Sequence, residues 1–147
     1  IEYKMNRKKY FGIGFINNYR GVEIRNKYSK ICLGKKDVTL IKNELNVSNE
    51  IIIFEGFFDY LTYKNLEKNE NSNSDYIILN STSMLFKVEE TLKKYDKISL
   101  FLDNDKNGNA TKKAILKKYE NVEDCSLIYQ KFKDLNEWFC NDDCRSF

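Results

Sequence analysis

Two aspartates, Asp103 and Asp105, follow directly after the apolar run KISLFL at residues 97–102. A spacing of two places both side chains on the same side of an extended segment. Earlier in the chain, Glu55 comes directly after the apolar run EIIIF at residues 50–54. Carboxylates in such positions are either solvated turn residues or ligands of a cation. The second interpretation is favoured because the pattern recurs at several strand ends.

Two further carboxylates lie near the ends of apolar runs. Asp59 is four residues after Glu55, and Asp134 follows the run DCSLIY at residues 124–129. Carboxylates that converge in a partly dry site repel one another unless they are protonated or bridged by divalent cations. Carboxylate sites without His or Cys suit Mg²⁺ or Mn²⁺. We therefore predict a Mg²⁺ or Mn²⁺ site with the ligands Glu55, Asp59, Asp103, Asp105 and Asp134.

Short apolar runs alternate with helix-like segments from residue 50 onward, which predicts an α/β fold with a parallel four-stranded sheet flanked by helices. The predicted strands are residues 50–54, 75–80, 97–102 and 124–129, and the predicted helices are residues 57–69, 87–95 and 109–120. In the first helix, Phe58, Leu61 and Leu66 are expected on the buried face. Asn109 is a plausible N-cap of the third. Ligands bind beyond the carboxyl ends of the strands in such sheets, where the carboxylates lie.

Residues 1–49 form a small basic, β-rich segment ahead of this sheet, so two domains are predicted, 1–49 and 50–147. The first contains eleven Lys and Arg against four Asp and Glu, a net charge of +7, whereas the whole chain carries only +3. Such asymmetry suggests a surface for a polyanion beside a site for cations. Candidate phosphate-binding residues are Arg20, Arg25, Lys30, Lys35 and Lys36, with Lys106 and Lys133 flanking the acidic motifs. Phe11 and Phe15 are expected in the core in preference to stacking on bases.

Composition excludes several classes of site. The chain has no His, which removes Ser-His triads and His-ligated metals, and its four Cys form no CxxC pair. We expect reduced thiols in a cytoplasmic protein. No apolar stretch approaches the roughly 18 residues that span a bilayer, so no membrane partner is expected. Because the chain begins at Ile1, we expect an excised domain or a processed fragment.

The motifs EGFFD at 55–59 and LDNDKNG at 102–108 resemble the Toprim domain of primases, topoisomerases and several nucleases. The segment KDLNEW at 133–138 looks closest to primase-type members, and the resemblance covers roughly residues 50–140. Residues 11–36 look like the basic segment before the Toprim domain in primase-like proteins of mobile elements. The resemblance implies metal-dependent phosphoryl transfer on nucleic acid, with Glu55, Asp103 and Asp105 as catalytic residues.

This resemblance predicts the catalytic core of a DNA primase-like protein that makes primers in DNA replication or mobilisation. Its partners would be single-stranded DNA, nucleoside triphosphates and a helicase or mobilisation protein. A Toprim nuclease and a non-catalytic nucleic-acid-binding module remain alternatives. A topoisomerase is less expected, because Asn107 stands where that class usually has a further acidic residue.

Overall fold

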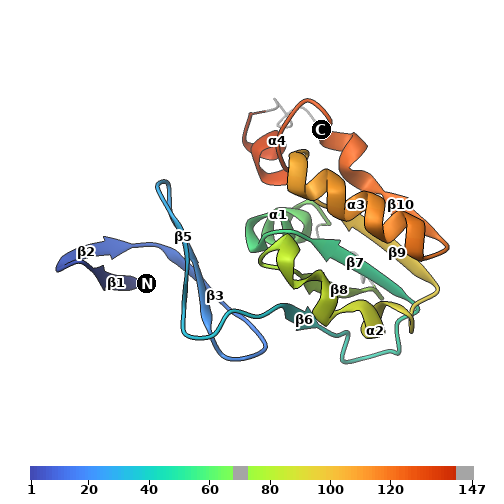
Figure 1. Ribbon diagram of the computed structural model, residues 1–147, viewed down its shortest axis with the longest axis horizontal. Coiled ribbons are helices and arrows are strands. Elements are labelled where there is room, and N and C mark those ends of the chain that lie inside the picture. Colours follow the sequence, from blue (N-terminus) through green and yellow to red (C-terminus); the bar gives the residue numbers. More distant parts are fainter. Residues whose placement is uncertain (68–72, 142–147) are drawn as a thin grey trace.

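A computed structural model of the chain describes residues 1–67 and 73–141. Its centre is a five-stranded sheet of order β10-β9-β7-β8-β6 (Figure 1). Four strands run parallel, and β6 runs antiparallel to β8. The strands are β6 (Thr39–Ile41), β7 (Glu50–Phe54), β8 (Asp75–Ile78), β9 (Lys97–Phe101) and β10 (Val122–Asp124). The predicted α/β class with a mostly parallel sheet is therefore confirmed.

The antiparallel edge strand β6 is an addition to the four strands that the sequence predicts. It pairs Thr39 with Ile78 and Ile41 with Tyr76, and so covers the edge that β8 would otherwise leave unpaired. Its residues precede position 50, where we expected the domain with the parallel sheet to begin. The central sheet thus includes a strand from the basic N-terminal segment.

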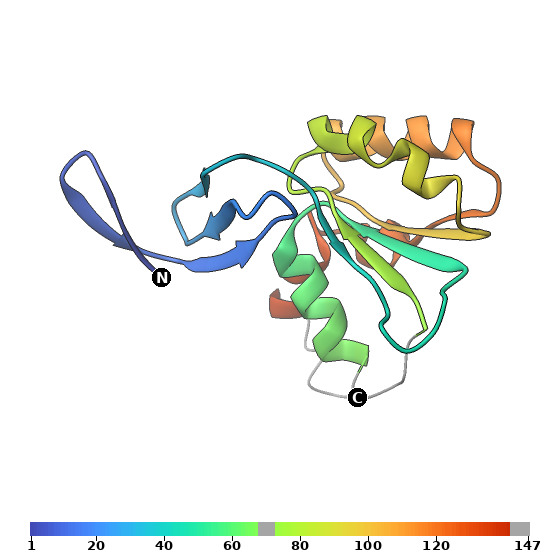
Figure 2. The ribbon, with the colours of Figure 1, turned by 90° about the horizontal axis from the view of Figure 1, so that it is seen from below.

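Helices cover both faces of the sheet (Figure 2). They are α1 (Phe57–Glu67), the 3₁₀ helix η1 (Thr82–Lys87), α2 (Glu89–Leu92), α3 (Lys106–Lys118), the 3₁₀ helix η2 (Cys125–Tyr129) and α4 (Leu135–Asn141). The first core contains Leu92 of α2 and Ile115 of α3, and the second contains Phe57 of α1 and Leu135 of α4. Helices α2 and α3 therefore cover one face, and α1 and α4 cover the other.

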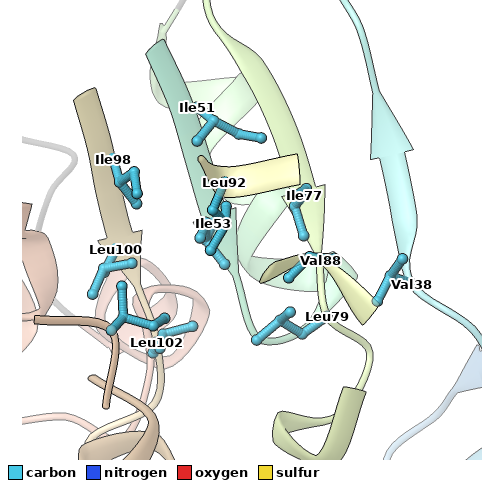
Figure 3. Close-up of a cluster of buried hydrophobic side chains, with 11 residues drawn as sticks. Val38, Ile51, Ile53, Ile77, Leu79, Val88, Leu92, Ile98, Leu100 and Leu102 are labelled. Atoms are coloured by element: carbon cyan, nitrogen blue, oxygen red, sulfur yellow. The ribbon is translucent and has the colours of Figure 1, made fainter. Parts of the chain in front are cut away.

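Alternation along the strands produces these two cores. In β7, Ile51 and Ile53 lie in the first core (Figure 3), whereas Ile52 and Phe54 lie in the second. Successive side chains of a strand point to opposite faces, and all four of these residues are buried. This explains why the strand reads as a continuous apolar run rather than an alternating one.

The predicted strand at residues 124–129 is wrong in its position. The last strand, β10, ends at Asp124, and residues 125–129 form η2. The carboxylate of Asp124 accepts a hydrogen bond from the Ser126 amide at 3.0 Å, which favours a helical turn over a continued strand. Tyr129 is nevertheless in the core, as expected, and its hydroxyl donates to the Leu102 carbonyl at 3.0 Å.

Two predicted details of the helices are also wrong. In α1, Leu61 and Leu66 are each 40% exposed, because the face that meets the sheet carries Phe57 and Thr62 instead. Helix α3 begins at Lys106 rather than at residue 109, and its N-cap is Asp105, not Asn109.

The N-terminal residues form a hairpin and a small antiparallel sheet of order β3-β4-β5. The strands are β1 (Glu2–Met5), β2 (Lys8–Phe11), β3 (Ile13–Ile16), β4 (Val22–Arg25) and β5 (Lys30–Leu33). The ring of Phe15 stacks on Phe57 with centroids 5.2 Å apart, which docks the small sheet on α1. Phe15 thus packs as expected, but Phe11 is 69% exposed, so that prediction is wrong.

No helix within the described residues is both long enough and apolar enough to cross a membrane.

Candidate metal centre and nucleic-acid interface

Glu55, Asp103 and Asp105 meet at the carboxyl edge of the central sheet. Strands β7 and β9 are parallel neighbours with Phe54 opposite Phe101, so Glu55 and the residues after β9 leave the sheet at the same edge. One carboxylate oxygen from each of the three residues lies within 4.8 Å of the other two. The Glu55 Oε2 atom also accepts a hydrogen bond from the Asp103 amide at 3.3 Å.

The donor set of this acidic cluster suits a divalent cation. It consists of carboxylate oxygens alone, the ligands that Mg²⁺ and Mn²⁺ prefer. Asp103 is buried, and one of its oxygens lies 3.6 Å from the Lys133 ammonium. Three carboxylates so close together carry more negative charge than one lysine offsets, which a divalent ion would balance. The cluster can therefore hold a metal ion.

The loop after β9 is held by Asn104, which stands between the two aspartates. Its side-chain amide donates to the carbonyls of Ser126, Tyr129 and Phe132 at 3.1–3.3 Å. Its Oδ1 atom accepts from the buried Lys112 ammonium at 2.9 Å. These bonds tie the loop to η2 and α3, so the neighbouring aspartates are positioned by a rigid frame.

Helix α3 begins within this frame. The Asp105 carboxylate accepts a hydrogen bond from the Gly108 amide at 2.9 Å, so one side chain both caps the helix and belongs to the acidic cluster. A Cβ atom at position 108 would lie 2.0 Å from the Asp103 carbonyl oxygen. Only glycine allows the helix to approach the loop this closely.

We expect Gly108→Ala to move the loop and destabilise the protein. The added methyl group meets backbone rather than a flexible side chain, and overpacking of this kind costs about 1–3 kcal/mol. Urea unfolding measures the loss, with the exposed Asn109→Ala in the same helical turn as the control. Equal stability of Gly108→Ala and wild type would show that the loop after β9 can move away from the added methyl group without a loss of free energy.

Asp59 and Asp134, the other predicted ligands, lie beside the acidic cluster rather than within it. Asp59 is buried in α1, and its Oδ1 atom accepts from the Asn136 amide at 3.1 Å. Asp134 caps α4 by accepting from the Glu137 amide at 2.7 Å. Both carboxylates line the same cavity as the cluster. Asp134 thus has a structural role as the cap of α4, in addition to the predicted role as a ligand.

Burial and mutual repulsion raise the pKa values of these carboxyl groups. Burial, followed by the charges of Glu55 and Asp134, raises the pKa of Asp103 to about 7. Burial and then Asp134 raise the pKa of Asp59 to about 8. Burial is also the main cause that raises the pKa of Glu55, although the bond from the Asp103 amide opposes it. The site therefore holds protons near neutral pH when no cation is bound.

The stability of the metal-free protein should fall as pH rises. An unfolded Asp loses its proton near pH 4, whereas folded Asp59 keeps it to about pH 8. Between these two pH values the folded state binds more protons than the unfolded state. The free energy of unfolding therefore decreases as pH rises, and the loss is complete above the folded pKa of Asp59. Urea unfolding in EDTA between about pH 5 and about pH 9 measures this trend.

Asp59→Asn should reduce that dependence, because the amide does not titrate, and the raised pKa of Asp103 should leave a smaller slope. Asp96→Asn, an exposed change after α2, is the control and should leave the trend intact. A wild-type stability that is constant over the same range would contradict the raised pKa of Asp59.

The acidic cluster opens into a cavity of about 370 Å³ between the small sheet and the central sheet. Three of the predicted phosphate-binding cations line it: Arg25 at the end of β4, Lys30 at the start of β5, and Lys133 before α4. Burial lowers the pKa of Arg25, and the nearby carboxylates of Asp103, Asp59, Glu23 and Glu55 oppose this shift. One cavity thus presents cations opposite carboxylates.

The other predicted cations do not line this cavity. Arg20 belongs to the β3–β4 turn and Lys35 follows β5, at the opposite end of the small sheet from Arg25 and Lys30. The Lys35 ammonium instead lies 3.8 Å from the ring centroid of Tyr19. Lys36 and Lys106 are also exposed outside the cavity. The antiparallel pairing of β4 with β5 explains why Arg25 and Lys30 come together.

Several lining residues were not predicted from the sequence as part of the site: Asn26, Ser29, Phe58 and Asn136. Tyr28, which the sequence suggests as a residue that stacks on bases, also lines the cavity. Asn26, Tyr28 and Ser29 belong to the turn between β4 and β5, where the Asn26 side chain accepts hydrogen bonds from the Tyr28 and Ser29 amides at 2.8 Å. The segment Asn-Lys-Tyr-Ser is a recognisable turn signal. Its place beside the acidic cluster depends on docking of the small sheet, for which the sequence carries no local signal.

Comparison with known proteins agrees with this fold. A family model described as Toprim-like matches residues 52–139. The chain belongs to the Toprim-like family. A second family model, a domain of unknown function (DUF8464), matches residues 1–34. No curated protein matched the chain.

Two solved structures from bacteriophage T7 share the fold. The primase fragment of the primase-helicase protein aligns with a TM-score of 0.63 and 19% identity over 95% of this chain. A chain from the structure of the lagging-strand DNA polymerase interacting with primase domains bound to an RNA/DNA hybrid and dTTP aligns with a TM-score of 0.61 and 20% identity over 98% of this chain. The chain covers 61% and 77% of those two chains. Both alignments include the small N-terminal sheet, which is thus part of the shared fold.

Proposed function

We propose that this chain is the catalytic Toprim domain of a DNA primase-like protein, which joins nucleotides into primers on single-stranded DNA in a reaction that depends on Mg²⁺ or Mn²⁺. The observation that carries the proposal is the cavity in which Glu55, Asp103 and Asp105 face Arg25 and Lys30. Transfer of a nucleotidyl group needs a cation site for the reacting phosphate and fixed positive charge for the remaining phosphates. One cavity supplies both.

The metal would be held by Glu55, Asp103 and Asp105, with Asp59 and Asp134 as further ligands. When bound, it would neutralise the negative charge that develops on the transferred phosphoryl group. Arg25, Lys30 and Lys133 would bind and orient phosphates of the nucleotide or of the strand.

Glu55 has a second role in this proposal beside that of a ligand. Its carboxyl group lies at the cavity, and burial raises its pKa above the usual value of a glutamate, which suits a general acid or base. Its hydrogen bond from the Asp103 amide keeps the side chain directed toward the cluster.

The T7 structures support the choice of substrates and partners. One is a fragment of a primase-helicase protein, and the other shows primase domains bound to an RNA/DNA hybrid and dTTP. By analogy, the partners of this chain would be single-stranded DNA, nucleoside triphosphates and a helicase. A Toprim nuclease would use the same metal ions to activate a water molecule that cleaves the strand, and it remains the second candidate.

The experiment incubates the protein with single-stranded DNA, labelled nucleoside triphosphates and Mg²⁺ or Mn²⁺. Extended or newly made labelled strands that disappear in EDTA support the primase-like function. Strands that are cut instead, without incorporation of label, would establish the nuclease. A protein that shows neither activity under these conditions would refute catalysis by this site.

A further inference from the structure

The β1–β2 hairpin concentrates positive charge away from the acidic cluster. It carries Lys4, Arg7, Lys8 and Lys9, all exposed, and its acidic residue is Glu2. The hairpin projects from the body of the protein in both ribbon views (Figures 1 and 2). Its charges are therefore open to a partner on several sides.

The arrangement of these charges weakens the hairpin itself. Lys4 stands directly opposite Lys9 in the register of the two strands, and like charges in such pairs are destabilising. Lys9 lies 3.2 Å from Glu2, but both side chains are exposed, so this ion pair offsets little of the repulsion. An anion bound at the hairpin would relieve it.

The turn of the hairpin also departs from what stability alone favours. Its central residues Asn6 and Arg7 have positive φ angles of 50° and 64°. Two-residue hairpin turns of this kind favour Asn followed by Gly, because glycine adopts the left-handed conformation without strain. Here a long cation occupies the second position. The turn thus presents positive charge at the tip at the expense of local stability.

The base of the hairpin is attached to the turn that lines the candidate metal centre. The Tyr3 hydroxyl accepts a hydrogen bond from the Asn26 side chain at 3.0 Å and lies 3.1 Å from the Ser29 hydroxyl. Both Asn26 and Ser29 line the cavity with the acidic cluster. The hairpin is therefore positioned relative to the site by direct bonds.

A second cavity of about 490 Å³ lies between the hairpin and the site. It shares Arg25, Asn26 and Phe58 with the first cavity, and Phe11 at the end of β2 and Lys27 also line it. The exposed ring of Phe11 offers a face on which a base can stack, and Lys27 offers a charge for a phosphate. A path of cations and aromatic rings thus leads from the acidic cluster to the hairpin.

We propose that the β1–β2 hairpin is a basic arm that binds the phosphates of a single-stranded nucleic acid where the strand leaves the metal centre. This inference rests on the proposed function, because it takes the strand in the cavity to be the substrate. The arm adds affinity through charge and does not read sequence, because its cations stand on an exposed hairpin rather than in a groove that contacts base edges.

The experiment measures binding rather than turnover, so that it does not depend on catalysis. A variant with Lys4→Gln, Arg7→Gly, Lys8→Gln and Lys9→Gln removes the charge of the arm, and Arg7→Gly keeps the turn geometry favourable. The control removes four exposed lysines on the α2–α3 side: Lys94→Gln, Lys113→Gln, Lys117→Gln and Lys118→Gln. One lysine of each set pairs with a glutamate, namely Lys9 with Glu2 and Lys118 with Glu89. Fluorescence anisotropy in EDTA then follows labelled single-stranded DNA over a range of salt concentrations.

We expect the arm variant to bind a long oligonucleotide about tenfold more weakly at low salt, with a flatter slope of log affinity against log salt. Each lost phosphate contact should reduce that slope by about 0.7. A short oligonucleotide that fills only the cavity should bind wild type and variant equally, and the control should retain the wild-type slope. Arg7→Gly alone should flatten the slope by the amount expected for about one phosphate contact. It should keep or raise the melting temperature, because glycine suits the turn, so a weaker affinity would be due to the lost charge and not to unfolding.

An arm variant with the affinity and salt slope of wild type on the long oligonucleotide would overturn the proposal. An equal loss of affinity in the control variant would also overturn the proposal, because it would mean that any four exposed cations contribute to binding. The wild-type protein could also neither extend nor cut DNA while its salt slope is steeper than that of the arm variant. This result would refute the catalytic function but support binding of nucleic acid by the hairpin.

Discussion

Replacing Glu55 by Gln should lower nucleotidyl transfer by about 10²–10³-fold or more while the protein still folds. The change removes one negative charge from the acidic cluster and with it a metal ligand or proton carrier. The amide oxygen of Gln can still accept the hydrogen bond that Glu55 accepts from the Asp103 amide, so the geometry of the loop is retained. Labelled primer synthesis on single-stranded DNA measures activity, and thermal unfolding measures folding.

The matched control is Glu120→Gln, which removes one exposed charge just after α3 and should leave activity unchanged. Full activity of Glu55→Gln would show that this side chain only shapes the turn after β7. The proposed chemistry would then have to proceed through Asp103 and Asp105 alone.

Millimolar Mn²⁺ should raise the thermal stability of the wild-type protein and leave the double variant Asp103→Asn/Asp105→Asn nearly unchanged. A ligand that binds only the folded state stabilises it by about 2.7 kcal/mol at a concentration about 100 times the Kd. In a domain of this size, each kcal/mol shifts the melting temperature by about 2–4 °C. Differential scanning fluorimetry with and without metal measures the shift.

The substitutions in this double variant were chosen to spare the fold. Asn remains a good N-cap, so position 105 can still accept the bond from the Gly108 amide that begins α3. Asn at position 103 removes a buried carboxyl group whose pKa is raised to about 7, which relieves repulsion. Asp96→Asn is the control. The same metal response in the double variant and in wild type would place the cation elsewhere.

Local patterns in the sequence were sufficient for three strands of the central sheet, β7, β8 and β9, and for the acidic cluster. Strands β7, β8 and β9 begin where the apolar runs begin, because a strand buried on both faces needs an uninterrupted apolar segment. Glu55, Asp103 and Asp105 could be grouped from the sequence because parallel strands present their carboxyl ends at one edge. Both inferences use residues that are close in the chain to the element that positions them.

Elements whose partners are distant in the chain required the tertiary structure. The edge strand β6 is only three residues long, and its pairing with β8 joins segments more than thirty residues apart. Residues 125–129 read as a strand but form η2, in which the Asp124 side chain accepts from the Ser126 amide and the Asn104 side chain donates to the Tyr129 carbonyl. An apolar, β-rich composition does not distinguish these outcomes.

The sequence by itself thus determined the fold class and three carboxylates at the edge of the sheet, whereas only the tertiary structure decided which cations face them. Of the seven basic candidates, Arg25, Lys30 and Lys133 line the cavity. Arg25 and Lys30 are brought there by the pairing of β4 with β5 and by the stacking of Phe15 on Phe57. Exposed lysines and arginines look alike in a sequence, because their solvation does not depend on local pattern. Their role is set by the docking of one sheet on another, which depends on contacts between distant parts of the chain.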